Sequence, residues 1–97
     1  MHLAISKLTI RTPESHTLKD KRRVANSLSS KLRNKYNIAI AEVEISDTPK
    51  TVTLGIACVS DSRKHAEQIM SNVTRFVEHS RTDSYIVDNS MEIISGI

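Results

Sequence analysis

The side chains with the clearest chemical potential lie between Leu18 and Tyr36, where basic residues gather around a single acid, Asp20. The basic members of this stretch are Lys19, Lys21, Arg22, Arg23, Lys31, Arg33 and Lys35. They make up half of the 14 Lys and Arg residues of the chain. Lysine and arginine donate charge-assisted hydrogen bonds to phosphate oxygens, so this composition predicts contact with a polyanion.

The same stretch has the hydrophobic spacing of an amphipathic helix. Its apolar face is formed by Leu18, Val24, Ala25, Leu28, Leu32 and Tyr36. At about 3.6 residues per turn, Lys19, Arg23 and Arg33 lie opposite that face with small polar residues between them, which lets phosphates approach closely. The predicted nucleic-acid-binding residues are Lys19, Arg22, Arg23, Lys31, Arg33 and Lys35. The alternative is a solvated face that only maintains solubility.

Lys21 differs from the other basic residues because helical spacing places it near the centre of the apolar face, one turn after Leu18. A buried ammonium group needs a hydrogen-bonding partner or a path by which its end reaches water. The sequence therefore predicts either an ion pair with an acid at the end of the sheet or a side chain that extends to solvent. A catalytic lysine with a lowered pKa is a third interpretation, for which the sequence offers no partner.

Other residue types give little support for metal binding or catalysis. The histidines are His2, His16, His65 and His79. Their spacing lacks the i, i+4 pairs of helical metal ligands. The one cysteine, Cys58, excludes an intrachain disulfide and falls on the core side of a predicted strand, where it acts as a small apolar residue. We therefore expect a protein without enzymatic activity, metal ion or cofactor.

Periodicity predicts six elements in the order strand, helix, strand, strand, helix, strand. The predicted strands are Leu3–Arg11, Ile38–Ile45, Thr51–Val59 and Tyr85–Ile94, and the predicted helices are Leu18–Tyr36 and a segment from Ser60 and Asp61, its caps, to about His79. Thr17 and Asp20 suit the start of the first helix. Polar loops are predicted at Ser46–Lys50 and Ser80–Ser84. This order predicts an α+β, ferredoxin-like βαββαβ fold, with two helices on one face of a four-stranded antiparallel sheet.

In this topology the second and fourth strands form the edges of the sheet. Glu42 and Glu44 are two positions apart in the second strand and so are predicted to share one face, where exposure to water suits them. Paired carboxylates can also divide acid and base roles, but solubility at a sheet edge and pairing with a neighbouring cation explain them more simply. We expect these two glutamates to be exposed structural residues.

Whole-chain properties are consistent with one domain spanning residues 1–97. The chain has 97 residues with 38% hydrophobic and 26% charged content, which is ordinary for a small folded domain. The formal net charge of +3 permits an acidic partner without requiring one. Because the sequence contains no apolar run of membrane-spanning length and no signal-peptide core, we expect a cytoplasmic protein that does not associate with membranes.

The sheet face opposite the helices is predicted to have an apolar end. The predicted interaction surface consists of Leu3, Ile5, Ile38 and Ile40, with Ala57 and Val59 beside them. Such a patch is usually covered. The carboxy-terminal Met91, Ile93, Ile94 and Ile97 are candidates for that cover within the monomer, and a homodimer or another protein partner is the alternative.

Several short stretches resemble the YlxP-like family of small bacterial proteins. These stretches are Thr17–Val24 (TLKDKRRV), Lys31–Ile38 (KLRNKYNI), Ala41–Val43 (AEV), Leu54–Ala57 (LGIA) and Val59–Ser60. The resemblance implies a ferredoxin-like fold and no assigned reaction. Family genes often neighbour those of translation initiation and ribosome maturation, which implies a role near the ribosome. The chain departs from the family in the loop Asp47–Lys50, where Pro49 replaces an aromatic residue.

Related functions of this architecture are disfavoured by the loop Thr12–Thr17, which lacks glycine. An acylphosphatase needs a glycine-rich phosphate loop there, a metal chaperone needs a CxxC motif, and an ACT-type regulatory module, a weak alternative, usually also has glycine in this loop. We expect instead an RNA-binding protein whose first helix contacts phosphates of structured RNA or a ribosomal particle. The alternative is a protein-interaction or dimerisation module that uses the apolar sheet face.

Overall fold

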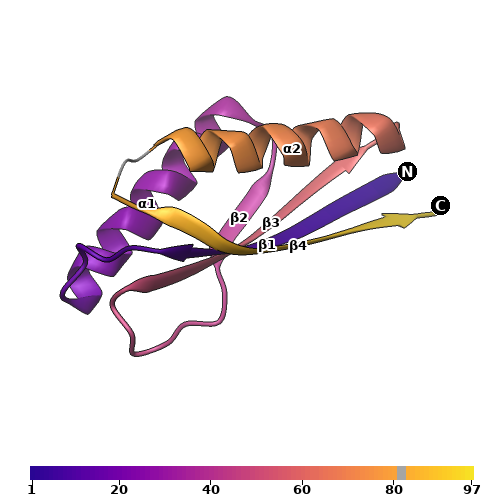
Figure 1. Cartoon of the computed structure of the whole chain (residues 1–97). Helices are drawn as coiled ribbons and strands as arrows, with labels where there is room; N and C mark the ends of the chain where they lie inside the picture. Colours follow the sequence, from indigo (N-terminus) through magenta and orange to yellow (C-terminus); the bar gives the residue numbers. More distant parts are fainter. Residues whose placement is uncertain (81–82) are drawn as a thin grey trace.

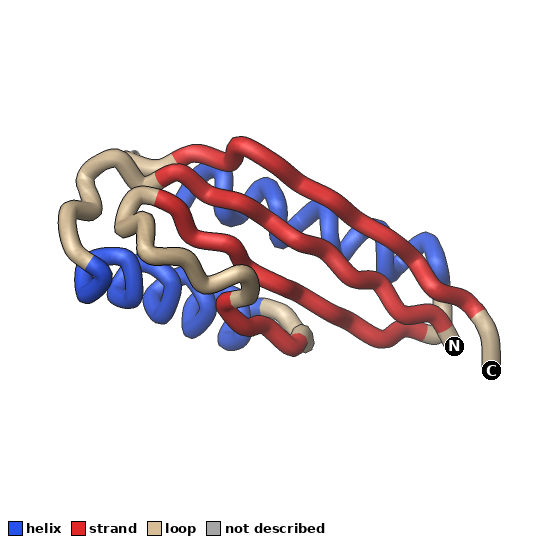
Figure 2. Tube along the Cα trace, turned by 90° about the horizontal axis from the view of Figure 1, so that it is seen from below, coloured by secondary structure: helices blue, strands red, loops and turns tan. Residues whose placement is uncertain are grey.

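The computed structural model describes residues 1–80 and 83–97 and has the element order β1-α1-β2-β3-α2-β4. The strands are β1 (His2–Arg11), β2 (Ala39–Glu42), β3 (Thr51–Ser60) and β4 (Tyr85–Ser95), and the helices are α1 (Leu18–Lys35) and α2 (Arg63–Ser80). Both helices lie on one face of the sheet and leave the other face uncovered (Figure 1, Figure 2). The predicted ferredoxin-like architecture is confirmed.

The sheet is antiparallel throughout, with strand order β2-β3-β1-β4. β1 pairs along its whole length with β3 on one side and with β4 on the other, so the first and third strands are central, as predicted. The pairing with β4 shifts register between Thr9 and Ile10. Both chain ends lie at the same end of the sheet (Figure 1), where the amino group of Met1 donates to the carbonyl of Ile97 at 3.0 Å.

The hydrophobic core lies between the covered sheet face and the helices. The sheet contributes Ala4, Leu8, Ile10, Ile40, Val52, Leu54, Ile56 and Cys58, and the helices contribute Val24, Ala25, Leu28, Leu32, Ala66, Met70, Val73 and Val77. α1 packs over β2 and β3, while α2 packs over β1, β3 and β4. Because their apolar faces pack on the sheet, the two helices direct their polar faces outward. Neither helix is long and apolar enough to cross a membrane, judged on the described residues.

Three predicted segments differ from the structure or fall partly outside it. The second helix begins at Arg63, and the hydroxyl of Ser62 accepts from the amide of His65 at 3.2 Å, so its cap is Ser62 and not the predicted Ser60 or Asp61. The strand predicted over Ile38–Ile45 is limited to β2, because after Glu42 the chain leaves regular pairing and Glu44 adopts a left-handed backbone conformation with φ of 49°. One contact persists beyond the strand, since the amide of Val43 donates to Thr53 at 2.9 Å. The loop predicted at Ser80–Ser84 includes residues 81 and 82, which lie outside the described residues.

Gly55 allows the chain to fold back after β2. It lies opposite Lys7 and Ala41 on the uncovered face, and a Cβ atom added at Gly55 would lie 2.9 Å from Cγ1 of Val43. The side chain of Val43 therefore occupies the space that any larger residue at position 55 would need. Figure 2 shows the segment after β2 continuing along the sheet edge beside β3.

We expect Gly55→Ala to destabilise the protein by about 1 kcal/mol, because the overlap with Val43 outweighs the strand preference of alanine. In a Val43→Ala background, the same substitution should become neutral or stabilise by about 0.5 kcal/mol. Chemical denaturation of the wild type, both single variants and the double variant measures this coupling. Equal effects of Gly55→Ala in both backgrounds would show that Val43 does not limit this position.

Candidate nucleic-acid interface

The first turn of α1 is fixed by the capping box predicted from Thr17 and Asp20. The hydroxyl of Thr17 accepts from the amide of Asp20 at 3.1 Å, and the Asp20 carboxylate accepts from the amides of His16 at 3.0 Å and Thr17 at 3.2 Å. The pKa of the Asp20 carboxyl is lowered mainly by the hydrogen bond from the His16 amide and further by its hydrogen bonds with Thr17, and the positive charge of Arg23 adds to the effect. The one acid of the basic helix is thus engaged by the helix start itself.

All six predicted phosphate-binding residues are exposed on α1. They are Lys19, Arg22, Arg23, Lys31, Arg33 and Lys35. Within residues 1–80 and 83–97, none of the six forms an ion pair at 4 Å or less. Lys19 and Arg23 lie opposite the buried face formed by residues such as Leu28, as predicted, whereas Arg33 lies on the side of the helix next to β2. The cationic surface of α1 is therefore the exposed part of the helix that carries these six residues.

Two of the six cations have local contacts at the carboxy-terminal half of α1. A guanidinium nitrogen of Arg33 lies 3.5 Å from the carbonyl of Ile40 on β2. The ammonium of Lys35 lies over the rings of Tyr36 and Phe76, at 5.9 and 5.0 Å from their centroids. Both contacts leave the positive charge unneutralised. Arg33 thus marks the margin of the cationic surface towards β2, and Lys35 marks its margin towards α2.

Lys21 is buried, with 2% of its surface exposed, beneath the loop that follows β2. Its Nζ donates to the carbonyl of Ser46 at 3.0 Å and lies 3.7 Å from a carboxylate oxygen of Glu42. The predicted ion pair with an acid at the end of the sheet is confirmed, and the partner is Glu42. This contact joins α1 to both β2 and the following loop.

Glu42 and Glu44 do not share one face, contrary to the prediction. Glu42 points to the helix side and pairs with Lys21, whereas Glu44 pairs with Lys7 on the uncovered side of the sheet. The left-handed backbone of Glu44 breaks the alternation between them. The hydrogen bond to Glu44 raises the pKa of the Lys7 ammonium. Both carboxylates therefore have structural partners on different sides of the sheet.

The prediction that Ile38 and Ile40 lie on the uncovered face is wrong. Ile40 is 9% exposed and lies opposite Ile56 in the core, and Ile38 packs against the same cluster. Ala39 and Ala41 take the uncovered positions instead. Successive side chains of a strand point to opposite faces, so an offset of one residue in the assignment exchanges the two faces. The predicted face is therefore wrong for every side chain of β2.

An apolar patch nevertheless exists on the uncovered face. Leu3 and Ile5 remain on it, and Leu3 lies between Val59 and Ile94, which are 62% and 53% exposed. The carboxy-terminal segment does not cover this patch, because β4 runs beside β1 as an edge strand and Ile94 is itself part of the patch. The apolar patch on the uncovered face thus consists of Leu3, Ile5, Val59 and Ile94.

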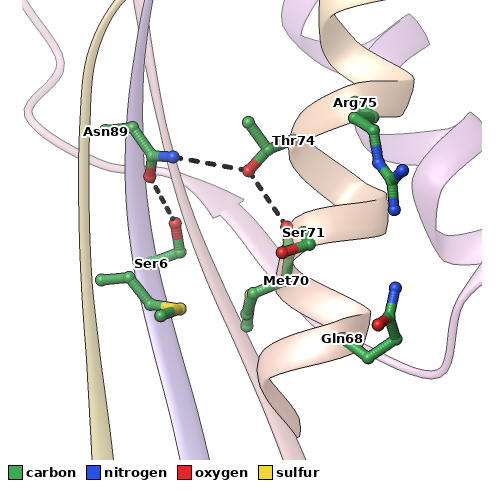
Figure 3. A pocket seen from close by; sticks show the side chains of 8 residues that line it. Ser6, Gln68, Met70, Ser71, Thr74, Arg75 and Asn89 are labelled. Atoms are coloured by element: carbon green, nitrogen blue, oxygen red, sulfur yellow. Dashed lines mark hydrogen bonds between the residues drawn. The ribbon is translucent and has the colours of Figure 1, made fainter. Parts of the chain in front are cut away.

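A polar groove of about 490 Å³ lies between α2 and β4 and was not predicted. Ser6 donates to Asn89 at 3.2 Å, Asn89 donates to Thr74 at 3.5 Å, and Thr74 donates to the carbonyl of Met70 at 3.0 Å (Figure 3). The available signal was Ser6, a polar residue on the core-facing side of the first strand. These bonds tie β4 to α2. Among the described residues that line the groove, Arg75 is the one with a charged side chain.

The remaining candidates for reactive chemistry are inert by position. Cys58 is buried in the core, as predicted, and burial raises the pKa of its thiol, which disfavours the nucleophilic thiolate. Over the part of the chain that the structure describes, no three His, Cys, Asp or Glu side chains are grouped to hold a metal ion.

Comparison with known proteins places the chain in a family. Residues 3–91 match the family described as "Protein of unknown function (DUF503)". The chain belongs to the DUF503 family. A relative of this DUF503 chain, "Uncharacterized protein YlxP" of Bacillus subtilis (strain 168), is 34% identical over 65 residues, which cover 67% of this chain and 71% of the relative. The resemblance to YlxP-like proteins is confirmed.

Solved structures agree with the fold of this DUF503 chain. The de novo designed protein Foldit4 has a TM-score of 0.57 and 10% identity over the full length of both chains. A second de novo design, LFR1 1 with ferredoxin fold, has a TM-score of 0.51 and 17% identity, covering 97% of this chain and 84% of that chain. At these identities the likeness shows the ferredoxin-like fold alone.

We expect Lys21→Met in the DUF503 chain to lower the free energy of unfolding by about 2 kcal/mol, because Glu42 and the Ser46 carbonyl lose their donor. Lys19→Met, which removes an exposed cation two residues away, should change it by less than about 0.5 kcal/mol. Adding Glu42→Gln to Lys21→Met should recover part of the loss. Denaturant unfolding of these variants makes the comparison, and a Lys21→Met effect as small as that of Lys19→Met would contradict the assigned role.

Proposed function

We propose that this DUF503 protein is a non-enzymatic cytoplasmic protein that binds phosphates of structured RNA through α1, in work related to the ribosome. The observation that supports this function best is the set of exposed cations on α1 without carboxylate partners among the described residues. Exposed Lys and Arg side chains on one rigid element suit sequence-independent contact with a phosphate backbone.

The distribution of acids strengthens the proposal. A charged surface that serves only solubility commonly mixes both signs. Here Asp20, the one acid in α1, is held by backbone amides at the start of the helix, and Lys21, the one buried cation of α1, has Glu42 as its partner. The outward face of α1 is left with positive charge and small polar residues such as Asn26 and Ser30.

The dimensions of α1 suit several phosphates at once. Lys19 and Arg33 are 14 positions apart on a continuous helix, which corresponds to about 21 Å along its axis. Phosphates of one strand follow each other every 3.4 Å or so along a duplex axis, so this length spans several of them.

The chain has three aromatic residues, of which Tyr85 alone lies on a strand. A sheet that stacks bases, as in RRM domains, is therefore disfavoured relative to phosphate contact by the helix.

We expect the triple variant Lys19→Glu, Arg23→Glu, Arg33→Glu to bind a structured RNA more weakly and with less salt dependence. Each lost phosphate contact should reduce the slope of log K against log salt by about 0.9, and three lost contacts by about 2 to 3. Fluorescence anisotropy across a salt series measures the slope.

A matched control carries the same change in net charge at other exposed cations, namely Arg11→Glu, Arg63→Glu and Lys64→Glu. If binding depended on overall charge alone, the control and the α1 variant would lose affinity equally. That result, or an unchanged slope in the α1 variant, would remove α1 as the RNA-binding element.

A second candidate function is self-association through the uncovered sheet face. It is favoured by the exposure of Val59 and Ile94 beside Leu3 and Ile5, because an isologous two-fold contact can bury the same apolar patch on both copies. If this function holds, wild type should sediment as a dimer and Val59→Lys, a change on β3, as a monomer. The control Val87→Lys, which changes an exposed valine of β4 outside the patch, should remain a dimer. A monomeric wild type at high concentration would exclude it.

A further inference from the structure

A second cationic site lies where the carboxy-terminal end of α1 meets the outer surface of α2. A pocket of about 350 Å³ is present there. It is lined by Lys35, Tyr36, Asn72, Arg75, Phe76, His79 and Ser80. The α2 members at 72, 75, 76 and 79 follow i, i+3, i+4, i+7 spacing and so share one side of that helix. A cavity of this size is at the lower end of the range for small-molecule ligands.

Three basic side chains of this pocket are positioned by neighbouring groups. Arg75 donates to the side-chain oxygen of Asn72 at 2.8 Å, which fixes one end of its guanidinium. The Nδ1 atom of His79 lies 2.8 Å from the carbonyl of Arg75, which can only accept, so Nδ1 bears a proton; Nε2 donates to an anion when it is protonated as well, in the imidazolium form. Lys35 is held over the Phe76 ring at 5.0 Å. The three groups are thus partly ordered before any ligand arrives.

The pocket retains a positive charge after its structural needs are met. Lys35 and His79 lie in the last turns of α1 and α2, where each helix end has about half a negative charge. Two such ends amount to about one negative charge, which Lys35 alone offsets. Arg75 lies before the last turn and has no carboxylate within 4 Å among residues 1–80 and 83–97. Arg75, with His79, is therefore available to an anion.

Aromatic rings distinguish this pocket from a simple phosphate site. Tyr36 and Phe76 are two of the three aromatic residues in the chain, and both line the pocket while only half-buried. An inorganic anion gains nothing from contact with an apolar surface, because it has no apolar part. A nucleotide has both a phosphate for the cations and a planar base for a ring, and such stacking tolerates any base.

We propose that this pocket binds one unpaired nucleotide of an RNA strand, with its phosphate at Arg75 and His79 and its base over the Phe76 ring, in the place that Lys35 occupies in the free protein. The inference rests on the proposed function, because Lys35 belongs to the same cationic surface of α1, and it extends that function by naming the feature of RNA that is recognised. The target is then a structured RNA with an unpaired residue, such as a hairpin loop, in preference to a continuous duplex.

The pocket can be tested apart from any RNA by titrating the full chain with uridine 5′-monophosphate and following amide and His79 ring signals by NMR. We expect shifts concentrated at Lys35, Phe76 and His79, and weaker binding of inorganic phosphate by about tenfold. Equal affinity for inorganic phosphate would overturn the assignment of a nucleotide site. Shifts spread evenly over all exposed cations would overturn the pocket.

Arg75→Gln supplies the variant test, with Arg63→Gln as a matched control on the same helix. Both arginines are exposed, and Arg63 pairs with Glu67, one turn away from it on α2. Arg75→Gln should weaken nucleotide binding about tenfold, as expected for one lost charge-assisted contact, whereas Arg63→Gln should change it less than twofold. Thermal unfolding of both variants shows that the fold is retained. Equal effects of the two variants would contradict the proposed site.

An RNA comparison separates this inference from the proposed function. A hairpin with an unpaired loop and a continuous duplex are titrated with wild type, Arg75→Gln and the α1 triple variant. If both proposals hold, Arg75→Gln weakens hairpin binding alone, while the α1 variant weakens both RNAs. If Arg75→Gln affects neither RNA while the α1 variant affects both, the nucleotide pocket fails and the α1 function stands. If the mononucleotide binds at the pocket but the α1 variant changes neither RNA, the α1 function fails.

Discussion

The position of Lys21 determines how the amino-terminal half of this molecule is assembled. A lysine with almost no exposed surface must satisfy its ammonium group inside the protein, and here it does so with the Ser46 carbonyl and Glu42. That requirement fixes the rotation of α1 about its axis, because the side carrying Lys21 must face β2 and the loop after it. The neighbours Lys19, Arg22 and Arg23 are consequently turned towards solvent. One internal contact thus determines which cations of the helix can meet an external anion.

The same contact determines the orientation of β2. Glu42 reaches Lys21 only if it points to the helix side, and alternation then places Ile40 on that side as well. The chain leaves the sheet directly after Glu42, and Val43 packs over the bare backbone of Gly55 on the opposite face. A charged side chain, rather than an apolar one, therefore has a large part in setting the register of this short edge strand. The pairing illustrates how a buried polar contact can specify one arrangement among several of similar apolar burial.

These dependencies explain what sequence patterns could and could not predict. The capping box, the burial of Lys21 and most of the apolar face of α1 follow from local spacing and were predicted correctly. Leu18 is the exception, because it was assigned to the apolar face and is 45% exposed. The face of β2 was not, because Ile38 and Ile40 on one side and Ala39 and Ala41 on the other are both apolar, so alternation alone leaves two solutions. The pocket between the helices could not be found either, since Lys35 and Arg75 are 40 positions apart and neither belongs to a recognisable motif.

The two proposed surfaces lie on opposite sides of the sheet, and this geometry affects how they could work together. The two helices form one layer on one face of the sheet (Figure 1), and they carry the cations of α1 and the pocket beside α2. Leu3, Ile5, Val59 and Ile94 lie on the face without helices. Two copies joined through their uncovered faces would direct both helix layers outward, away from the contact. Each copy would then keep its full cationic surface, and a single RNA with two suitably spaced loops could engage both copies with increased avidity. Self-association and RNA binding are therefore compatible in this fold, because neither surface needs residues that the other uses.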